Sequence, residues 1–168
     1  MRLFKSSKET TGEPEHSAEP DRGSLNPADS LMDSMLSDPK ILQMNNYIQH
    51  GKVTSYQHVK RVAAMSLAIS RFFHLKTDEE VLVRAALLHD YYLYDWHGHG
   101  DHLHGYHHPF IAAENAARDF HVSEKEQECI RTHMWPLNIK RPPSSKEAAI
   151  ICIADKLCSL DETLRMRK

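Results

Sequence analysis

Histidine is the residue type in this sequence that points most directly to chemistry. The 168 residues include 13 histidines, and five of them lie in the segment from Trp96 to His107. The neutral imidazole ring is a common metal ligand, and its unperturbed pKa lies near neutral pH. The composition therefore favours metal binding or proton transfer as the chemistry of this protein.

Five polar side chains lie on or beside the apolar faces of predicted helices, where core residues are expected: His58, His89, Asp90, His133 and Asp155. His58 precedes Val62 by four residues and Met65 by seven, so it extends the apolar stripe of its helix. Asp90 is turned by about 100° from His89 and stays close to the same seam. The spacing thus predicts that these side chains point into the core.

Two buried aspartates need positive partners, because the burial of an isolated carboxylate costs several kcal/mol. Arg61, Arg84 and Lys156 are available as partners, and a core network of ion pairs is one interpretation. A metal site is the simpler interpretation, since it also accounts for the histidines. Nitrogen and carboxylate ligands without a thiolate pattern suit iron, manganese, cobalt or zinc. More than four ligands can hold two ions and leave positions for water, which favours catalysis over a structural zinc site.

The overall composition argues against several other classes of protein. Lys and Arg number 21 against 23 Asp and Glu, so the net charge of -2 provides no broad attraction for nucleic acid or an anionic membrane. Three cysteines without a C-x-x-C motif do not form a disulfide framework. The longest apolar run, residues 148–154, is too short to span a membrane, and no signal peptide follows the basic start. We expect a cytoplasmic protein.

The elements that must position these residues are helices. Residues 1–26 are rich in Lys, Ser, Glu, Pro and Gly and show no apolar period, which predicts a disordered tail before one domain at 27–168. Capping residues before proline predict helices that begin after Asn26 and Asp38, the second ending at Gly51.

Four further helix starts carry the capping-box pattern: Thr54/Gln57, Thr77/Glu80, Ser123/Glu126 and Ser144/Glu147. Another helix is expected to open at His108-Pro109 and run to Phe120. No segment alternates with period two over the length of a strand. The sequence predicts an all-α bundle of about six helices, with a histidine-rich loop at residues 97–107.

A histidine, a later His-Asp pair and a distant aspartate on helices resemble the signature of the HD superfamily of metal-dependent phosphohydrolases. The resemblance spans residues 39–165 and is carried by His58, by "ALLHD" ending in His89-Asp90, and by Asp155 in "CIADK". It implies an HD-type helical bundle. His108 in "HPFIAA" and His133 in "IRTHMWP" resemble the additional ligands of the two-metal branch. That branch includes the HD-GYP and symmetrical dinucleoside-tetraphosphate hydrolase families, although this chain has no GYP motif.

By that resemblance, two divalent ions share the ligands. His58, His89, Asp90 and Asp155 would hold one ion, while His108 and His133 would hold the second, with Asp90 as the bridge. His107 is a rival for His108. If two such ions lie roughly 3.5–4 Å apart, a water between them would lose its proton and attack phosphorus, while the metals would stabilise charge on the phosphoryl oxygens.

The implied activity is the hydrolysis of a phosphomonoester or phosphoanhydride in a small, nucleotide-like substrate. Asp90 would set the separation of the ions, and Arg61 and Lys156 would bind the substrate phosphate. Two alternatives remain open. Some members of the superfamily resemble di-iron oxygenases with the same ligand set, and the histidine loop at residues 97–107 also suits a non-catalytic metal-binding or sensing module.

Overall fold

A computed structural model describes residues 26–98 and 103–166 as a helical assembly with one short hairpin. The helices are α1 (Pro27–Leu36), α2 (Pro39–Leu42), α3 (Ser55–Phe72), α4 (Glu79–Leu88), α5 (His104–Phe120), α6 (Glu124–Thr132) and α7 (Lys146–Met166). A 3₁₀ turn at Gln43–Asn46 and the antiparallel strands β1 (Ile48–His50) and β2 (Val53–Thr54) connect α2 to α3. The expectation of a helical fold is confirmed. Residues 1–25 of the predicted tail lie outside the described residues.

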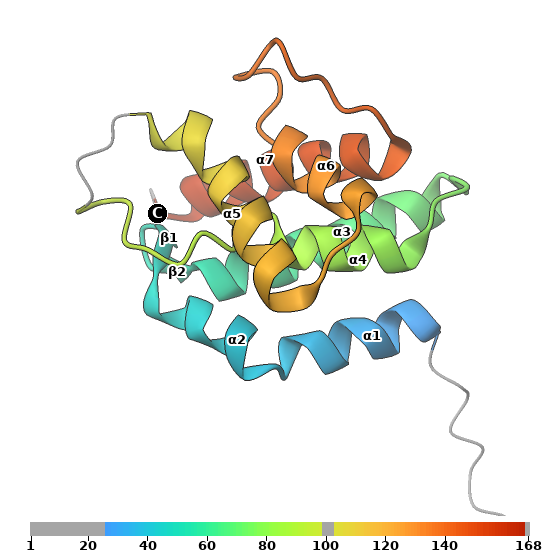
Figure 1. The fold of residues 1–168 in the computed structure, drawn as a ribbon, viewed down its shortest axis with the longest axis horizontal. Helices are drawn as coiled ribbons and strands as arrows, with labels where there is room; N and C mark the ends of the chain where they lie inside the picture. The colour runs from blue at the N-terminus through green and yellow to red at the C-terminus, as the bar shows by residue number, and fades with distance from the viewer. Residues whose placement is uncertain (1–25, 99–102, 167–168) are drawn as a thin grey trace, which may run out of the picture.

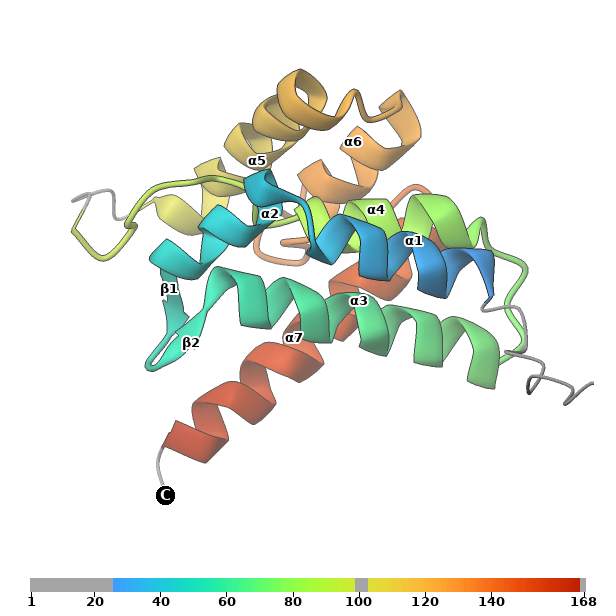
Figure 2. The ribbon, with the colours of Figure 1, turned by 90° about the horizontal axis from the view of Figure 1, so that it is seen from below.

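Helices α3 and α4 lie side by side at the centre of the molecule (Figure 1). Helix α1 packs on α4 and helix α7 on α3, so that α3 lies between α1 and α7 in the view of Figure 2. Helix α4 also contacts α5, α6 and α7, and every residue from Leu82 to Leu88 except Arg84 is buried. Helix α4 is therefore the element around which side chains from several helices meet.

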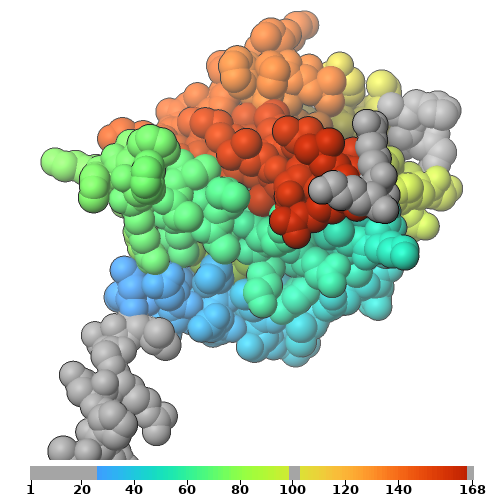
Figure 3. Space-filling model, turned by 180° about the vertical axis from the view of Figure 1, so that it is seen from behind, coloured from blue at the N-terminus to red at the C-terminus, as the bar shows by residue number. Residues whose placement is uncertain are grey.

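Helix α7 divides its surface between the core and the exterior. Ile151, Ala154 and Cys158 belong to the core, whereas Leu157 and Leu160 are exposed. Figure 3 shows α7, in red, on the face of the molecule opposite to that of Figure 1, flanked by α3 in green and teal. Because its inner face packs on α3, any polar side chain in the core stripe of α7 points toward α3 and α4.

Four predicted helix starts are confirmed by side-chain caps. The side-chain amide oxygen of Asn26 accepts a hydrogen bond from the backbone N–H two residues later at 2.9 Å. The carboxylate of Asp38 accepts one from the N–H two residues later at 2.7 Å. Thr54 and Ser123 form complete capping boxes with the residue three positions on. These caps satisfy N–H groups that have no partner within the helix.

The other two predicted capping boxes are wrong by one residue. Asp78, not Thr77, caps α4 by accepting a hydrogen bond from Val81 N at 3.2 Å. Ser145, not Ser144, caps α7 through Ala148 N at 3.1 Å. In both cases the neighbouring residue also has a side chain that can cap a helix, and the sequence pattern did not distinguish the two.

Three further expectations about the elements are wrong. The helix after Asp38 ends at Leu42, and Gly51 lies in the hairpin turn with a φ of 58°, a conformation that glycine adopts without strain. The hairpin itself was not expected. Helix α5 begins at His104, so Pro109 lies inside it as the sixth residue and does not open it.

Candidate metal centre

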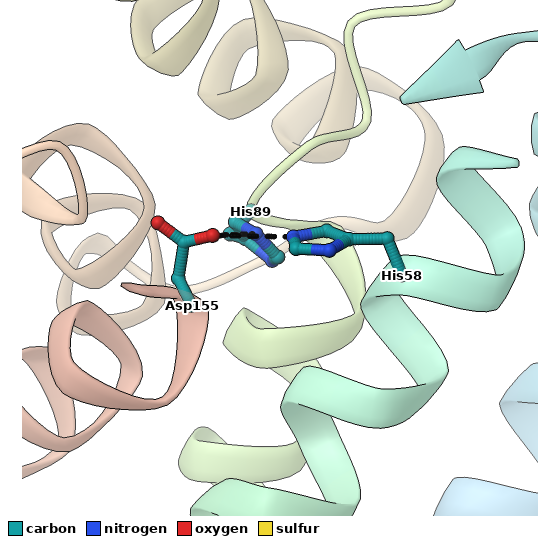
Figure 4. Close-up of side chains that lie close together, drawn as sticks. All are labelled: His58, His89 and Asp155. Atoms are coloured by element: carbon teal, nitrogen blue, oxygen red, sulfur yellow. Dashed lines mark hydrogen bonds and ion pairs between the residues drawn. The ribbon is translucent and has the colours of Figure 1, made fainter. Parts of the chain in front are cut away.

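The six residues predicted as metal ligands come together at the centre of the fold. They are His58 from α3, His89 and Asp90 directly after α4, His108 from α5, His133 directly after α6, and Asp155 from α7. All six are buried, with exposed fractions between 0 and 8%. Figure 4 shows His58, His89 and Asp155 pointing toward one another from three different elements.

Backbone carbonyls fix the orientation of three of the histidine rings. Nδ1 of His89, His108 and His133 lies 2.7–2.8 Å from a carbonyl oxygen three or four residues earlier. A carbonyl only accepts hydrogen bonds, so Nδ1 carries the hydrogen in each ring. The Nε2 atoms are thereby directed to the shared cluster, as is typical of metal-binding histidines.

His58 obtains the same orientation from a side chain. Its Nδ1 lies 3.0 Å from Glu162 Oε2, and its Nε2 lies 3.2 Å from Asp155 Oδ1. Asp155 Oδ1 is also 3.8 Å from His89 Nε2. These three donor atoms face one another closely enough to share one ion.

The carboxylate of Asp90 lies between two groups of donors. Its Oδ2 is 3.4 Å from His89 Nε2 and 3.7 Å from His58 Nε2. Its Oδ1 is 3.2 Å from His108 Nε2 and 3.7 Å from His133 Nε2. One oxygen of Asp90 therefore belongs to each side of the cluster.

Burial and mutual charge set the protonation of the cluster. Burial alone would raise the pKa of Asp90, but the adjacent His89 and His108 hold that pKa well below its usual value. Burial lowers the pKa of His133 to about 3, so its Nε2 is unprotonated and has a lone pair available for an ion. Burial also disfavours a charged His58, but its bonds to Asp155 and Glu162 raise the pKa of His58 to about 10. The acids are ionised and His133 is neutral, as metal ligands must be, whereas the raised pKa of His58 keeps a proton on both of its nitrogens until an ion displaces the one on Nε2.

The unsatisfied atoms of the cluster fit divalent ions. Within the described part of the chain, His89 Nε2 and Asp90 Oδ1 are buried without a hydrogen bond of acceptable geometry. Burial of a polar atom without a partner lowers the stability of the fold, so such atoms are expected to have a bound group. Nε2 of His108 and Nε2 of His133 lie only 3.0 Å apart. Two ligands on one ion at about 2.1 Å lie about 3.0–3.4 Å apart for angles of about 90–110°, so the observed spacing suits a shared ion.

Gln49 is a contact of the cluster that sequence patterns did not indicate. Its side-chain amide donates to Asp90 Oδ2 at 2.6 Å, and its carbonyl oxygen accepts from Ser55 Oγ at 3.1 Å and from the Tyr92 hydroxyl. Gln49 lies on β1, where no apolar stripe marks it as inward. The unexpected hairpin therefore holds an amide against the central carboxylate.

A cavity of about 1050 Å³ opens onto the cluster. Asp90, His108, His133 and Asp155 line it, together with an apolar wall that includes Met134, Pro136, Leu137 and Trp96. Lys156 is the one Lys or Arg among the described lining residues. Its Nζ donates to the His133 carbonyl at 2.9 Å, so it lies beside the predicted ligands.

Two other predicted candidates lie elsewhere. Arg61 is not among the residues that line the cavity, because its guanidinium pairs with Glu162 Oε1 at 2.8 Å and with Asp161. The side chain of His107 is exposed, whereas the adjacent His108 is buried in the cluster. The predicted histidine-rich loop at residues 97–107 is too long, because residues 104–107 belong to α5. Of its histidines, His97 and His104 line the cavity, while His99 and His102 lie outside the described residues.

Comparison with known proteins agrees with this arrangement. The family model described as HD domain matches residues 55–160, a range that contains all six residues of the cluster. Gln49 and Glu162 lie just outside the matched range. No curated protein matches the chain. None of the described helices is both long and apolar enough to cross a membrane.

Proposed function

The chain belongs to the HD domain family, and we propose that it hydrolyses a phosphate ester or anhydride of a small molecule with the help of two divalent ions. Proteins of this family are typically metal-dependent phosphohydrolases. The observation that carries the two-ion proposal is the position of Asp90, whose two oxygens face different groups of histidines. A single-ion site would need only one such group.

We assign the ligands accordingly. His58, His89, Asp155 and Oδ2 of Asp90 would hold one ion, and His108, His133 and Oδ1 of Asp90 would hold the other. Iron, manganese, cobalt and zinc all suit these donors. When bound, such ions supply Lewis acidity toward a phosphoryl group and lower the pKa of a bound water.

The residues of the chain itself provide orientation and binding. The backbone bonds at Nδ1 keep three imidazoles aimed at the cluster, so no reorientation is needed when substrate arrives. Asp90 and Asp155 balance the charge of the ions. The ammonium group of Lys156 lies where a phosphate oxygen of the substrate would be bound.

The cavity favours a particular kind of substrate. Its volume of about 1050 Å³ suits a molecule of nucleotide size. One ammonium group among the described lining residues matches a single phosphate better than a polyphosphate chain. The apolar wall and the indole of Trp96 suit an aromatic or other apolar group. We therefore favour a phosphomonoester of a nucleoside-sized compound.

The test is metal analysis of the purified protein followed by a phosphate-release screen over nucleoside monophosphates, diphosphates and dinucleotides. We expect about two ions per chain and the fastest release from a monophosphate. Asp90→Asn should lower both the metal content and the turnover, because it weakens the shared ligand. Asp33→Asn, an exposed aspartate on α1, is the matched control and should change neither.

The same experiment separates the alternatives. Oxygen consumption by the iron-loaded protein, with no phosphate released from any substrate, would show that the activity is oxidation and would overturn the proposal of hydrolysis. Deletion of residues 97–103 tests the metal-binding module, because it shortens the loop and keeps His104, whose carbonyl orients His108. If bound metal is lost with that deletion but survives Asp90→Asn, the cluster is not the metal site and the proposal fails.

A further inference from the structure

Among the four histidines of the cluster, His58 is oriented in a different way from the others. His89, His108 and His133 donate from Nδ1 to backbone carbonyls, which substitution of a side chain does not remove. His58 Nδ1 instead faces the carboxylate of Glu162 at 3.0 Å. The orientation of this one ring therefore depends on a side chain.

Glu162 is buried to a degree that needs an explanation. Its exposed fraction is 1%, and burial of a carboxylate is costly unless charged or hydrogen-bonding partners compensate. Both oxygens have such a partner, since Oε2 contacts His58 and Oε1 accepts from Arg61 at 2.8 Å. The guanidinium of Arg61, about a third exposed, also pairs with Asp161 and thereby holds the Glu162 carboxylate in place beside His58.

We propose that Glu162 is a positioning residue of the metal centre, held in place by Arg61, which fixes the proton of His58 on Nδ1 and leaves Nε2 to bind an ion. The inference rests on the proposed metal-dependent function. It concerns a residue beyond the range of the family match, and it gives Arg61 a role other than phosphate binding.

The contact also makes the two ion positions unequal. A carboxylate that accepts the Nδ1 hydrogen makes the opposite ring nitrogen more basic than a carbonyl does. The position formed by His58, His89 and Asp155 thus has three carboxylates at hand, namely Asp155, Asp90 and Glu162. The position of His108 and His133 has only Asp90 within the described residues. The first position is therefore the tighter one, and Glu162 contributes to its affinity.

The test is the affinity of purified, metal-depleted protein for Zn²⁺ and Mn²⁺, measured by competition with a chelator. Glu162→Gln removes the charge but keeps an oxygen that can accept, so we expect about a 10-fold loss of affinity for the tight ion. Glu162→Ala removes both, and about a 100-fold loss is expected. The affinity for the second, more weakly bound ion should not change in either variant.

The chain provides a matched control for damage to the fold. Glu126 is another buried glutamate, 4% exposed, that pairs with an arginine, Arg84, and lies on α6. Glu126→Gln keeps the capping role and should leave metal affinity unchanged. Equal losses of affinity in Glu126→Gln and Glu162→Gln would show that any broken buried pair has this effect, and would overturn the proposal.

Ring protonation provides a second readout that a structural role would not change. In ¹H–¹⁵N spectra of the zinc-loaded protein, we expect all four cluster histidines to carry the proton on Nδ1. Glu162→Ala should alter the signals of one ring, that of His58, and leave the other three in place. Unchanged signals for His58 would contradict the assignment.

Arg61 distinguishes positioning from substrate binding. Arg61→Ala should lower the affinity for the tightly bound ion as Glu162→Gln does, while the KM for the substrate, measured at saturating metal, stays the same. A raised KM with unchanged metal affinity would return Arg61 to phosphate binding and overturn its role here. Wild-type protein that binds no ion would overturn the proposed function as well, whereas normal metal-dependent turnover with full affinity in Glu162→Gln would overturn this inference alone.

Discussion

At the residue scale, Lys156 combines a cationic group with a fixed position beside the cluster. Its Nζ donates to the His133 carbonyl at 2.9 Å and contacts Cys152 Sγ at 3.4 Å. An ammonium group has three donors, so these two contacts orient it and leave capacity for a phosphate oxygen. Its neighbour Asp155 lies 3.8 Å from the same nitrogen and keeps the local charge balanced.

We predict that Lys156→Met raises KM for a phosphorylated substrate by at least about 10-fold, because one charge-assisted hydrogen bond is worth about 1.5–3 kcal/mol and each 1.4 kcal/mol is tenfold. The value of kcat should change less, since the bond is present in both bound states. Steady-state kinetics at saturating metal measure the two constants. Lys146→Met, an exposed lysine on the same helix, is the control. An unchanged KM in Lys156→Met would exclude a role in binding.

The sequence predicted which residues point inward, but not their partners. His58 and Asp155 extend apolar stripes, and such periodicity reports the buried face of a helix whatever the residue type. The partners of these residues depend on which helices cross, and no local pattern contains that information. Glu162 follows Cys158 by four residues on the core stripe of α7 and would have been found by the same reasoning. Gln49, on a short strand, had no comparable signal.

At the scale of elements, Glu147 links the starts of two helices. It lies in the first turn of α7, and its Oε1 accepts from Asp78 N, at the start of α4, at 2.8 Å. Lys125 on α6 also donates to this oxygen at 3.1 Å. Burial alone would raise the pKa of Glu147, but these bonds lower that pKa below its usual value of 4.5. The contact joins three of the helices that carry the cluster.

We predict that Glu147→Ala lowers the free energy of unfolding by about 1–3 kcal/mol, because Asp78 N–H loses its partner. Glu147→Gln should cost less, since its amide oxygen still accepts. A lowered pKa stabilises the fold at pH above 4.5, and this contribution is lost as pH falls through the folded pKa. The difference between wild type and Glu147→Gln should therefore shrink from pH 7 to pH 4 in urea unfolding. Exposed Glu114→Gln is the control, and a pH-independent difference would contradict the prediction.

Element types were easier to predict than their exact limits. Polar caps and apolar periods are local, so the helices that begin after Asn26, Thr54 and Ser123 followed from sequence. The hairpin did not, because its two strands are too short to show alternation. Pro109 misled the prediction for a different reason. Proline is favoured at the first helical position, yet one proline within a helix of 17 residues is tolerated when the remaining bonds form.

At the scale of the whole molecule, the cluster connects elements that are far apart in sequence. Its proposed ligands come from α3, α5 and α7 and from the residues that follow α4 and α6. Without ions, the buried cluster contains ionised carboxylates and imidazoles whose polar atoms are incompletely satisfied. Bound ions would therefore stabilise the folded state as a whole in addition to serving the chemistry of the site. The reason is that ligands brought together by folding bind metal only in the folded state.

We predict that removal of metal lowers the melting temperature of the whole chain. An ion present at 100 times its Kd stabilises the folded state by about 2.7 kcal/mol, and for a domain of this size each kcal/mol corresponds to about 2–4 °C. Chelation should thus lower Tm by about 5–10 °C, and one equivalent of added ion should recover most of the loss because the position at His58 is the tighter one. Differential scanning calorimetry of loaded, depleted and reloaded protein measures this. In Asp90→Asn the chelator should have a smaller effect, because the loaded state is already weakened. An equal Tm in loaded and depleted wild type would show that the cluster is held together by protein contacts alone.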